Sequence, residues 1–126
     1  IPLVYQPGAS WRYSSSVDIQ GYIVEKITGQ TLGQFMADRI FRPLKMNDTS
    51  FFVPPPKAGR LAAVYAFNRD LGKIEEANKI FDRPLPTYLT PPNMESGGGG
   101  LVSTTMDYAR FCQMILRGGE LDPHVR

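Results

Sequence analysis

The sequence is short of the residues that build disulfides, metal sites and membrane spans. Its only cysteine, Cys112, and its only histidine, His124, exclude an internal disulfide and supply too few ligands for a structural metal. No apolar run approaches the ~20 residues that cross a bilayer, so we expect no membrane span. Residues 1–6 lack a basic stretch, a long apolar core and an initiating Met. We therefore expect no signal peptide there, and we expect the chain to be an excised piece.

An excess of charge of one sign is also lacking. The formal net charge is only +2, and Lys and Arg are scattered rather than clustered, which argues against a nucleic-acid partner. A hydrophobic content of 42% over 126 residues is ordinary for one globular domain with a modest core. The cellular compartment stays undecided.

Two helices are expected in the first third of the chain. The first begins at Ser15 or Ser16, gains dipole stabilisation from Asp18 in its first turn, and stops at Gly29. The second begins at Thr31 and ends before Pro43, so the pair should pack as a hairpin. The expected apolar faces are Ile19, Ile23, Val24 and Ile27 on the first helix, and Leu32, Phe35, Met36 and Ile40 on the second.

A third helix is expected near the end of the chain. Ser103 or Thr104 caps it, and Asp107 takes the part that Glu plays in a capping box. The glycines at 118–119 end it. Its expected apolar face is Tyr108, Phe111, Cys112 and Ile115, which makes Cys112 an inert core residue.

The region between these helices is rich in turns. Residues 50–53 favour a short extended segment, and residues 60–67 fit either a strand or a short helix. A turn at 68–73 and a returning strand at 73–75 are expected next. Residues 76–95 are dense in proline and predict no clear element.

Tyr13 is the first candidate for chemistry, because it sits on the turn directly before a helix. The helix can hold the tyrosine rigidly while its hydroxyl faces a cleft. A phenol of pKa about 10 is a poor base near neutral pH unless nearby cations favour the phenolate. Trp11 either lines the same cleft or anchors the core. For a lone tyrosine, an aromatic plug under a loop is the alternative.

Several motifs follow one another in a characteristic order. They are Pro7-Gly8-Ala9, Tyr13-Ser14-Ser15, Glu25-Lys26-Ile27-Thr28-Gly29-Gln30, Ile40-Phe41-Arg42-Pro43-Leu44-Lys45-Met46-Asn47-Asp48-Thr49, the stretch from Ser96 to Thr105, and Asp107-Tyr108-Ala109-Arg110-Phe111. Together they resemble the middle of the serine β-lactamase-related family, which includes class C β-lactamases, their esterase relatives, and D,D- or D-amino peptidases. The likeness covers almost the whole chain.

This resemblance implies roles for two residues. Tyr13 matches the tyrosine of the family's Tyr-x-Asn motif, which serves as general base for an acylated serine. Ser15 stands where β-lactamases usually have Asn, whose amide contacts the substrate's acylamino group. The shorter hydroxyl weakens a β-lactamase interpretation and favours the esterase branch. Ser15 is equally consistent with a simple helix cap.

The family's other two catalytic motifs are missing. No serine is followed three residues later by lysine, and there is no Lys-Thr-Gly or His-x-Gly strand motif. In family order, the nucleophile would precede residue 1 and the last motif would follow residue 126. The expected fold is therefore mainly α with short strands, an incomplete helical portion of an α/β β-lactamase or transpeptidase-like domain, with 1–126 as its middle segment.

The glycines at 97–100 match neither a phosphate-binding loop nor a complete dinucleotide fingerprint, and we expect no cofactor. One interpretation makes Gly98 and Gly99 part of a substrate-binding wall where backbone approaches the site. The other, which we favour here, is a turn that leads into the last helix.

The resulting hypothesis is a fragment of a serine hydrolase that acts through an acyl-enzyme on small ester or β-lactam substrates, inactive by itself. The alternative is a non-catalytic family member that binds a peptide or a partner protein. Apolar helix faces left exposed in the fragment would favour self-association.

Overall fold

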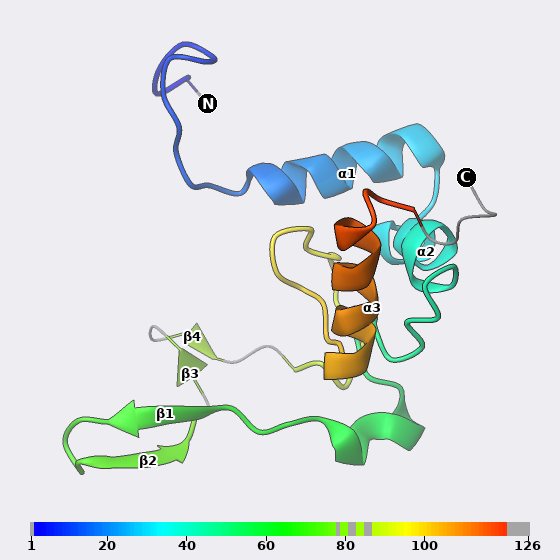
Figure 1. Ribbon diagram of the computed structural model, residues 1–126. Helices are drawn as coiled ribbons and strands as arrows, with labels where there is room; N and C mark the ends of the chain where they lie inside the picture. Colours follow the sequence, from blue (N-terminus) through cyan, green and yellow to red (C-terminus); the bar gives the residue numbers. More distant parts are fainter. Residues whose placement is uncertain (1, 78, 81–82, 85–86, 121–126) are drawn as a thin grey trace.

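The computed structural model describes residues 2–77, 79–80, 83–84 and 87–120. Three helices, α1 (Ser16–Thr28), α2 (Leu32–Met36) and α3 (Thr105–Leu116), form the body of the molecule. Short strands lie between α2 and α3 in the sequence. In Figure 1, α1 and α2 lie next to each other, and a β-hairpin stands away from the helices. The described part is thus mainly helical with short strands.

The ends of α1 and α2 follow the expected signals. Gly29 adopts φ 70°, the left-handed conformation that glycine takes without a steric penalty, and its N–H donates to the Glu25 carbonyl at 2.9 Å. Two residues later, the Thr31 hydroxyl accepts a hydrogen bond from the N–H of Gln34 at 3.2 Å. These two local features turn the chain back, so that α1 and α2 pack as the predicted hairpin.

The sequence predicted one regular second helix, but the observed helix is irregular. After α2 it widens into a π-helical turn over Ala37–Phe41, and the N–H of Arg42 donates to the Ala37 carbonyl five residues back at 2.9 Å. At 3.6 residues per turn, Leu32 and Phe41 would lie on opposite faces of a regular helix. The wider turn rotates Phe41 so that both side chains are buried.

The core of the described chain is small. Its buried apolar side chains are Leu32, Phe41, Met46 and Phe51. On α1, the predicted apolar face is covered only at Val24, which is half-buried. Ile19, Ile23 and Ile27 are 59%, 48% and 80% exposed, whereas Gly21 is buried. A Cβ on Gly21 would lie 2.8 Å from Leu32 Cδ2, so α2 packs on the glycine side of α1.

The predicted apolar face of α3 is also only partly covered. Phe111 and Cys112 are half-buried, while Tyr108 and Ile115 are 64% and 58% exposed. The capping box at the start of α3 is incomplete. The Thr104 hydroxyl accepts a hydrogen bond from the N–H of Asp107 at 3.2 Å, as predicted, but the Asp107 carboxylate turns to partners on another segment.

The Asp107 carboxylate binds the turn at Asp48-Thr49. The buried Asp107 carboxylate accepts hydrogen bonds from the backbone N–H of Asp48 at 2.7 Å and from the Thr49 hydroxyl at 3.0 Å. Arg110 pairs with the other carboxylate oxygen at 2.8 Å. These bonds fasten α3 to the turn that follows the second helix. A nearby antiparallel bridge between Ser50 and Val102 adds a second link.

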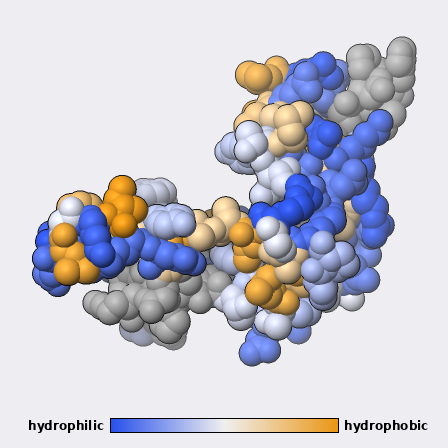
Figure 2. Space-filling view, turned by 90° about the horizontal axis from the view of Figure 1, so that it is seen from below, coloured by the Kyte–Doolittle hydropathy of each residue, from blue (hydrophilic) through white to orange (hydrophobic). Residues whose placement is uncertain are grey.

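The middle of the chain contains more structure than the sequence predicted. Pro55–Arg60 forms a 3₁₀-helix, and strand β1 (Tyr65–Asn68) pairs antiparallel with β2 (Lys73–Glu76), Tyr65 lying opposite Glu76. The predicted returning strand is therefore confirmed. Figure 2 shows this hairpin standing apart, at left, with apolar surface on it. Its exposed apolar side chains are Tyr65, Phe67, Leu71 and Ile74.

Within the proline-dense stretch 76–95, for which no element was expected, β3 (Lys79–Ile80) pairs with β4 (Arg83–Pro84). A two-residue ladder can hold a proline because an edge position needs no N–H donor. Positions 78, 81–82 and 85–86 lie outside the described residues, as does His124. Among the described helices, none has the length and apolar character required to traverse a bilayer.

Candidate active site

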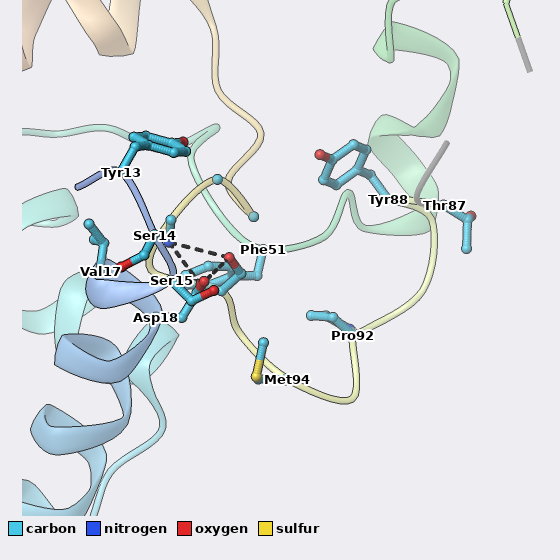
Figure 3. A pocket seen from close by; sticks show the side chains of 14 residues that line it. Tyr13, Ser14, Ser15, Val17, Asp18, Phe51, Thr87, Tyr88, Pro92 and Met94 are labelled. Carbon is cyan, nitrogen blue, oxygen red and sulfur yellow. Dashed lines mark hydrogen bonds between the residues drawn. The ribbon is translucent and has the colours of Figure 1, made fainter. Parts of the chain in front are cut away.

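A cavity of about 550 Å³ opens beside the start of α1. Figure 3 shows its side chains, with Tyr13 on one side and Tyr88 on the other. It is lined by the start of α1 and the turn before it, by the glycine loop (residues 96–100), by the far wall (residues 87–94), and by the ring of Phe51. Of the sequence-predicted site residues, the lining includes Tyr13, Ser15, Gly98 and Gly99.

Tyr13 lies at the rim of this cavity and is 83% exposed. The ring of Trp11 stands next to it, with centroids 6.5 Å apart and planes tilted by 52°. Trp11 is 82% exposed, so it is not a core anchor in the described chain, and it is not among the residues that line the cavity. Of the two aromatic side chains, only Tyr13 lines the cavity.

Ser15 occupies the N-cap position of α1, but among the described residues its side chain makes no capping hydrogen bond. The hydroxyls of its neighbours, Ser14 and Ser16, instead bond to each other at 2.8 Å. Ser15 lines the cavity together with Ser14. Its hydroxyl is therefore placed where a ligand in the cavity could reach it.

Asp18 joins α1 to the glycine loop. Its Oδ1 accepts a hydrogen bond from the Ser96 hydroxyl at 2.5 Å and another from the N–H of Gly98 at 3.1 Å. The Ser96 hydroxyl, followed by the Gly98 N–H, holds the pKa of the Asp18 carboxyl below its usual value. The sequence predicted only a helix-dipole role for Asp18, because no local pattern indicates that Ser96, 78 residues away, is its partner.

The glycine loop needs its small residues for close packing. A Cβ on Gly97 would lie 2.5 Å from the Val17 carbonyl oxygen, and one on Gly100 would lie 3.0 Å from the Phe51 ring. Gly98 and Gly99 face the cavity, and the same loop leads on to α3. The loop is thus the expected turn, and it also lines the cavity, while contact of Gly98 and Gly99 with a substrate stays a prediction.

The far wall was not predicted. Thr87, Tyr88, Pro92 and Met94 face the cavity from a segment to which sequence analysis assigned no element. The Tyr88 carbonyl accepts a hydrogen bond from the N–H of Val53 at 2.6 Å, which fastens this wall next to the core residue Phe51. The aromatic and apolar residues between prolines were the only sequence signal for it.

Charged groups gather at a second hollow of about 410 Å³, away from Tyr13. There Lys57 contacts Asp48 at 2.5 Å and Arg60 contacts the same carboxylate at 3.0 Å. Lys57, and after it Arg60, lowers the pKa of Asp48. These contacts hold the 3₁₀-helix on the Asp48-Thr49 turn. No group of three or more candidate metal ligands occurs in the described part of the chain.

Comparison with known proteins identifies relatives along the whole chain. A family model described as Beta-lactamase matches residues 1–126. A lovastatin esterase of Penicillium rubens is 47% identical over 120 residues, which cover 91% of this chain and 28% of that protein. A putative D-alanyl-D-alanine carboxypeptidase of Escherichia coli is 46% identical over 128 residues, covering 94% of this chain and 29% of that protein.

Solved structures agree with this relationship. A simvastatin synthase from Aspergillus terreus superposes with a TM-score of 0.76 at 28% identity, covering 96% of this chain and 29% of that one. The described fold therefore matches part of a larger β-lactamase and transpeptidase-like fold. The chain spans less than a third of the length of each of these relatives.

Proposed function

The chain belongs to the beta-lactamase family, and we propose that it is the helical middle portion of an α/β serine hydrolase that works through an acyl-enzyme. In this proposal the complete protein transfers the acyl group of an ester or amide to a serine and then to water. The serine and its lysine lie on a part of the protein outside residues 1–126. The chain alone is expected to be inactive, because a base without its nucleophile has nothing to activate.

The observation that supports this proposal is the cavity that gathers Tyr13, Ser15 and the glycine loop. In the sequence, Tyr13 and Gly98 are far apart, yet both face one space. A nucleophilic serine entering this cavity would meet a lining that includes Tyr13, Ser14 and Ser15.

We assign the role of general base to Tyr13. It accepts the proton of the serine hydroxyl as the serine oxygen bonds to the substrate carbonyl carbon, and it returns that proton to the departing alkoxide or amine. In the second half, it takes a proton from water as the water oxygen bonds to the acyl carbon, and it returns that proton to the serine oxygen as the acid is released. General base catalysis of this kind contributes roughly 10²–10⁴-fold.

Esters are the favoured substrates. Ser15 replaces the asparagine that would contact the acylamino group of a β-lactam, and one of the similar proteins is named a lovastatin esterase. Ser15, Gly98 and Gly99 are proposed to contact the substrate, and Trp11 to shield the outer edge beside Tyr13.

The test is turnover by the full-length protein, as wild type and as Tyr13→Phe, on a chromogenic short-chain ester and a chromogenic cephalosporin. A loss of ~10²-fold or more in kcat, with an unchanged melting temperature, supports Tyr13 as general base. An unchanged kcat would remove Tyr13 from proton transfer. Absence of any turnover by the wild type would instead favour a non-catalytic protein that binds a peptide or a partner.

A further inference from the structure

The carboxylate of Asp18 links the two walls of the cavity that lie nearest to Tyr13. Asp18 stands in the first turn of α1, five positions after Tyr13, and it accepts hydrogen bonds from Ser96 at 2.5 Å and from Gly98 N–H at 3.1 Å. The Ser96 hydroxyl in turn accepts a hydrogen bond from Gly98 N–H at 3.2 Å. The three groups form a closed triangle that joins the start of α1 to the glycine loop.

The backbone makes the same connection independently. Gly97 passes so close to Val17 that a Cβ on it would lie 2.5 Å from the Val17 carbonyl oxygen. Gly21, one turn further along α1, also approaches Gly97, its own Cβ position lying 3.7 Å from Gly97 Cα. The glycine loop therefore rests directly on the turn of α1 that carries Asp18.

Asp18 is well suited to hold this arrangement. It is half-buried, it lines the cavity, and its charged form is favoured by the Ser96 hydroxyl and the Gly98 N–H. Hydrogen bonds to a charged acceptor are stronger than those between neutral groups. The loop, by contrast, contains four consecutive glycines, whose backbone has many alternative conformations.

We propose that Asp18 is a positioning residue that fixes the glycine loop against the turn carrying Tyr13, so that the base and the substrate-contacting loop keep one geometry. This role rests on the proposed function of Tyr13. Asp18 exchanges no proton with the substrate in this scheme. It acts on the reaction only through the position of the loop, where small displacements are costly for rate.

The experiment uses the full-length protein and combines kinetics with amide hydrogen exchange. Asp18→Ala removes the acceptor, and Asp18→Asn keeps an oxygen acceptor without the charge. Asp38→Asn is the matched control, because Asp38 is an exposed acid that pairs with Arg42 on its own helix. Each Asp18 variant is made in the wild-type and the Tyr13→Phe backgrounds, and kcat and KM are measured on a chromogenic ester.

We expect Asp18→Ala to lower kcat by ~10-fold or more in the wild type but by less than ~3-fold in Tyr13→Phe, because the two residues act as one unit. Asp18→Asn should recover part of the loss, and Asp38→Asn should match the wild type. Amides of residues 96–100 should exchange faster in Asp18→Ala while those of α3 stay unchanged.

Equal losses in both backgrounds, or unchanged exchange at residues 96–100 in a folded Asp18→Ala protein, would overturn the proposal. Failure of the proposed function gives a different result, because Tyr13→Phe would then turn over ester as the wild type does. In that case the exchange measurement alone decides whether Asp18 holds the loop. A uniform rise in exchange across α1 and α3 would mark general destabilisation and would also overturn it.

Discussion

Gly97 lies against the carbonyl oxygen of Val17 so closely that a Cβ on Gly97 would come within 2.5 Å of it. The contact is with backbone, which cannot move away as a flexible side chain can. It sets how near the glycine loop approaches the turn that carries Tyr13. The identity of this one residue therefore shapes the cavity.

Gly97→Ala should destabilise the full-length protein by about 1–3 kcal/mol, the usual cost of forcing a methyl group into filled space. Gly99→Ala is the control for stability, since a Cβ on Gly99 meets no atom within 4 Å. Denaturant unfolding of both variants checks the prediction. Equal denaturation midpoints for Gly97→Ala and Gly99→Ala would show that the glycine loop is free to move away from α1.

Removal of the Asp107 carboxylate should also destabilise the fold. Asp107→Ala leaves the Asp48 N–H and the Thr49 hydroxyl without their acceptor in a buried place. An unsatisfied buried polar group costs about 1–3 kcal/mol. Thermal melting should show a clear fall for Asp107→Ala and little change for Asp38→Ala, whose side chain is on the surface. Similar melting of the two variants would contradict the prediction.

Ser15→Asn should shift the substrate preference. A longer amide at this position can reach the acylamino group of a cephalosporin, and one added hydrogen bond is worth about 0.5–1.5 kcal/mol, up to roughly tenfold in rate. We expect the ratio of kcat/KM for cephalosporin over ester to rise. Ser14→Asn, on the neighbouring residue, controls for bulk. A ratio that stays constant would place Ser15 outside the substrate-contacting surface.

Ser96→Ala should raise the pKa of Asp18 towards its ordinary value, because the Ser96 hydroxyl is the largest cause of the lowering. Since the pKa is lowered in the folded state, the stabilisation from Asp18 is present above the ordinary aspartate pKa of about 3.9 and is lost as the pH falls through the lower folded value. NMR titration of the carboxyl carbon measures the shift. Ser103→Ala, at the bond to Thr49, should leave the Asp18 titration unchanged.

The isolated 126-residue chain should self-associate through α1. Ile23 and Ile27 are exposed on the side of the helix away from Gly21 and α2, and an apolar stripe of this kind favours a partner surface. Sedimentation at rising concentration should show increasing mass, and Ile27→Glu should reduce it. The control is Gln113→Glu, which adds the same negative charge on α3. If both variants associate like the wild type, α1 is not the contact.

Local signals allowed accurate prediction of several elements. Gly29, Thr31 and Thr104 act on backbone groups only a few residues away, so the sequence alone places the helix ends near them. The family was indicated by the order of several motifs along the chain, among them the one around Tyr13. Prediction failed over Ala37–Phe41, where burial of Phe41 widened the helix, and over the far wall, whose residues carry no periodic pattern.

Sequence alone predicts both ends of α1 and α3 to within one or two residues, the start of α2, the returning strand β2, and membership of the family. Each of these follows from neighbouring residues or from ordered motifs. The folded chain alone shows that α2 packs on the glycine side of α1, that Asp18 binds Ser96, and that Asp107 binds the Asp48 turn. The two hydrogen bonds join residues 78 and 59 positions apart, and such partners are selected by packing and by the need to satisfy buried polar groups.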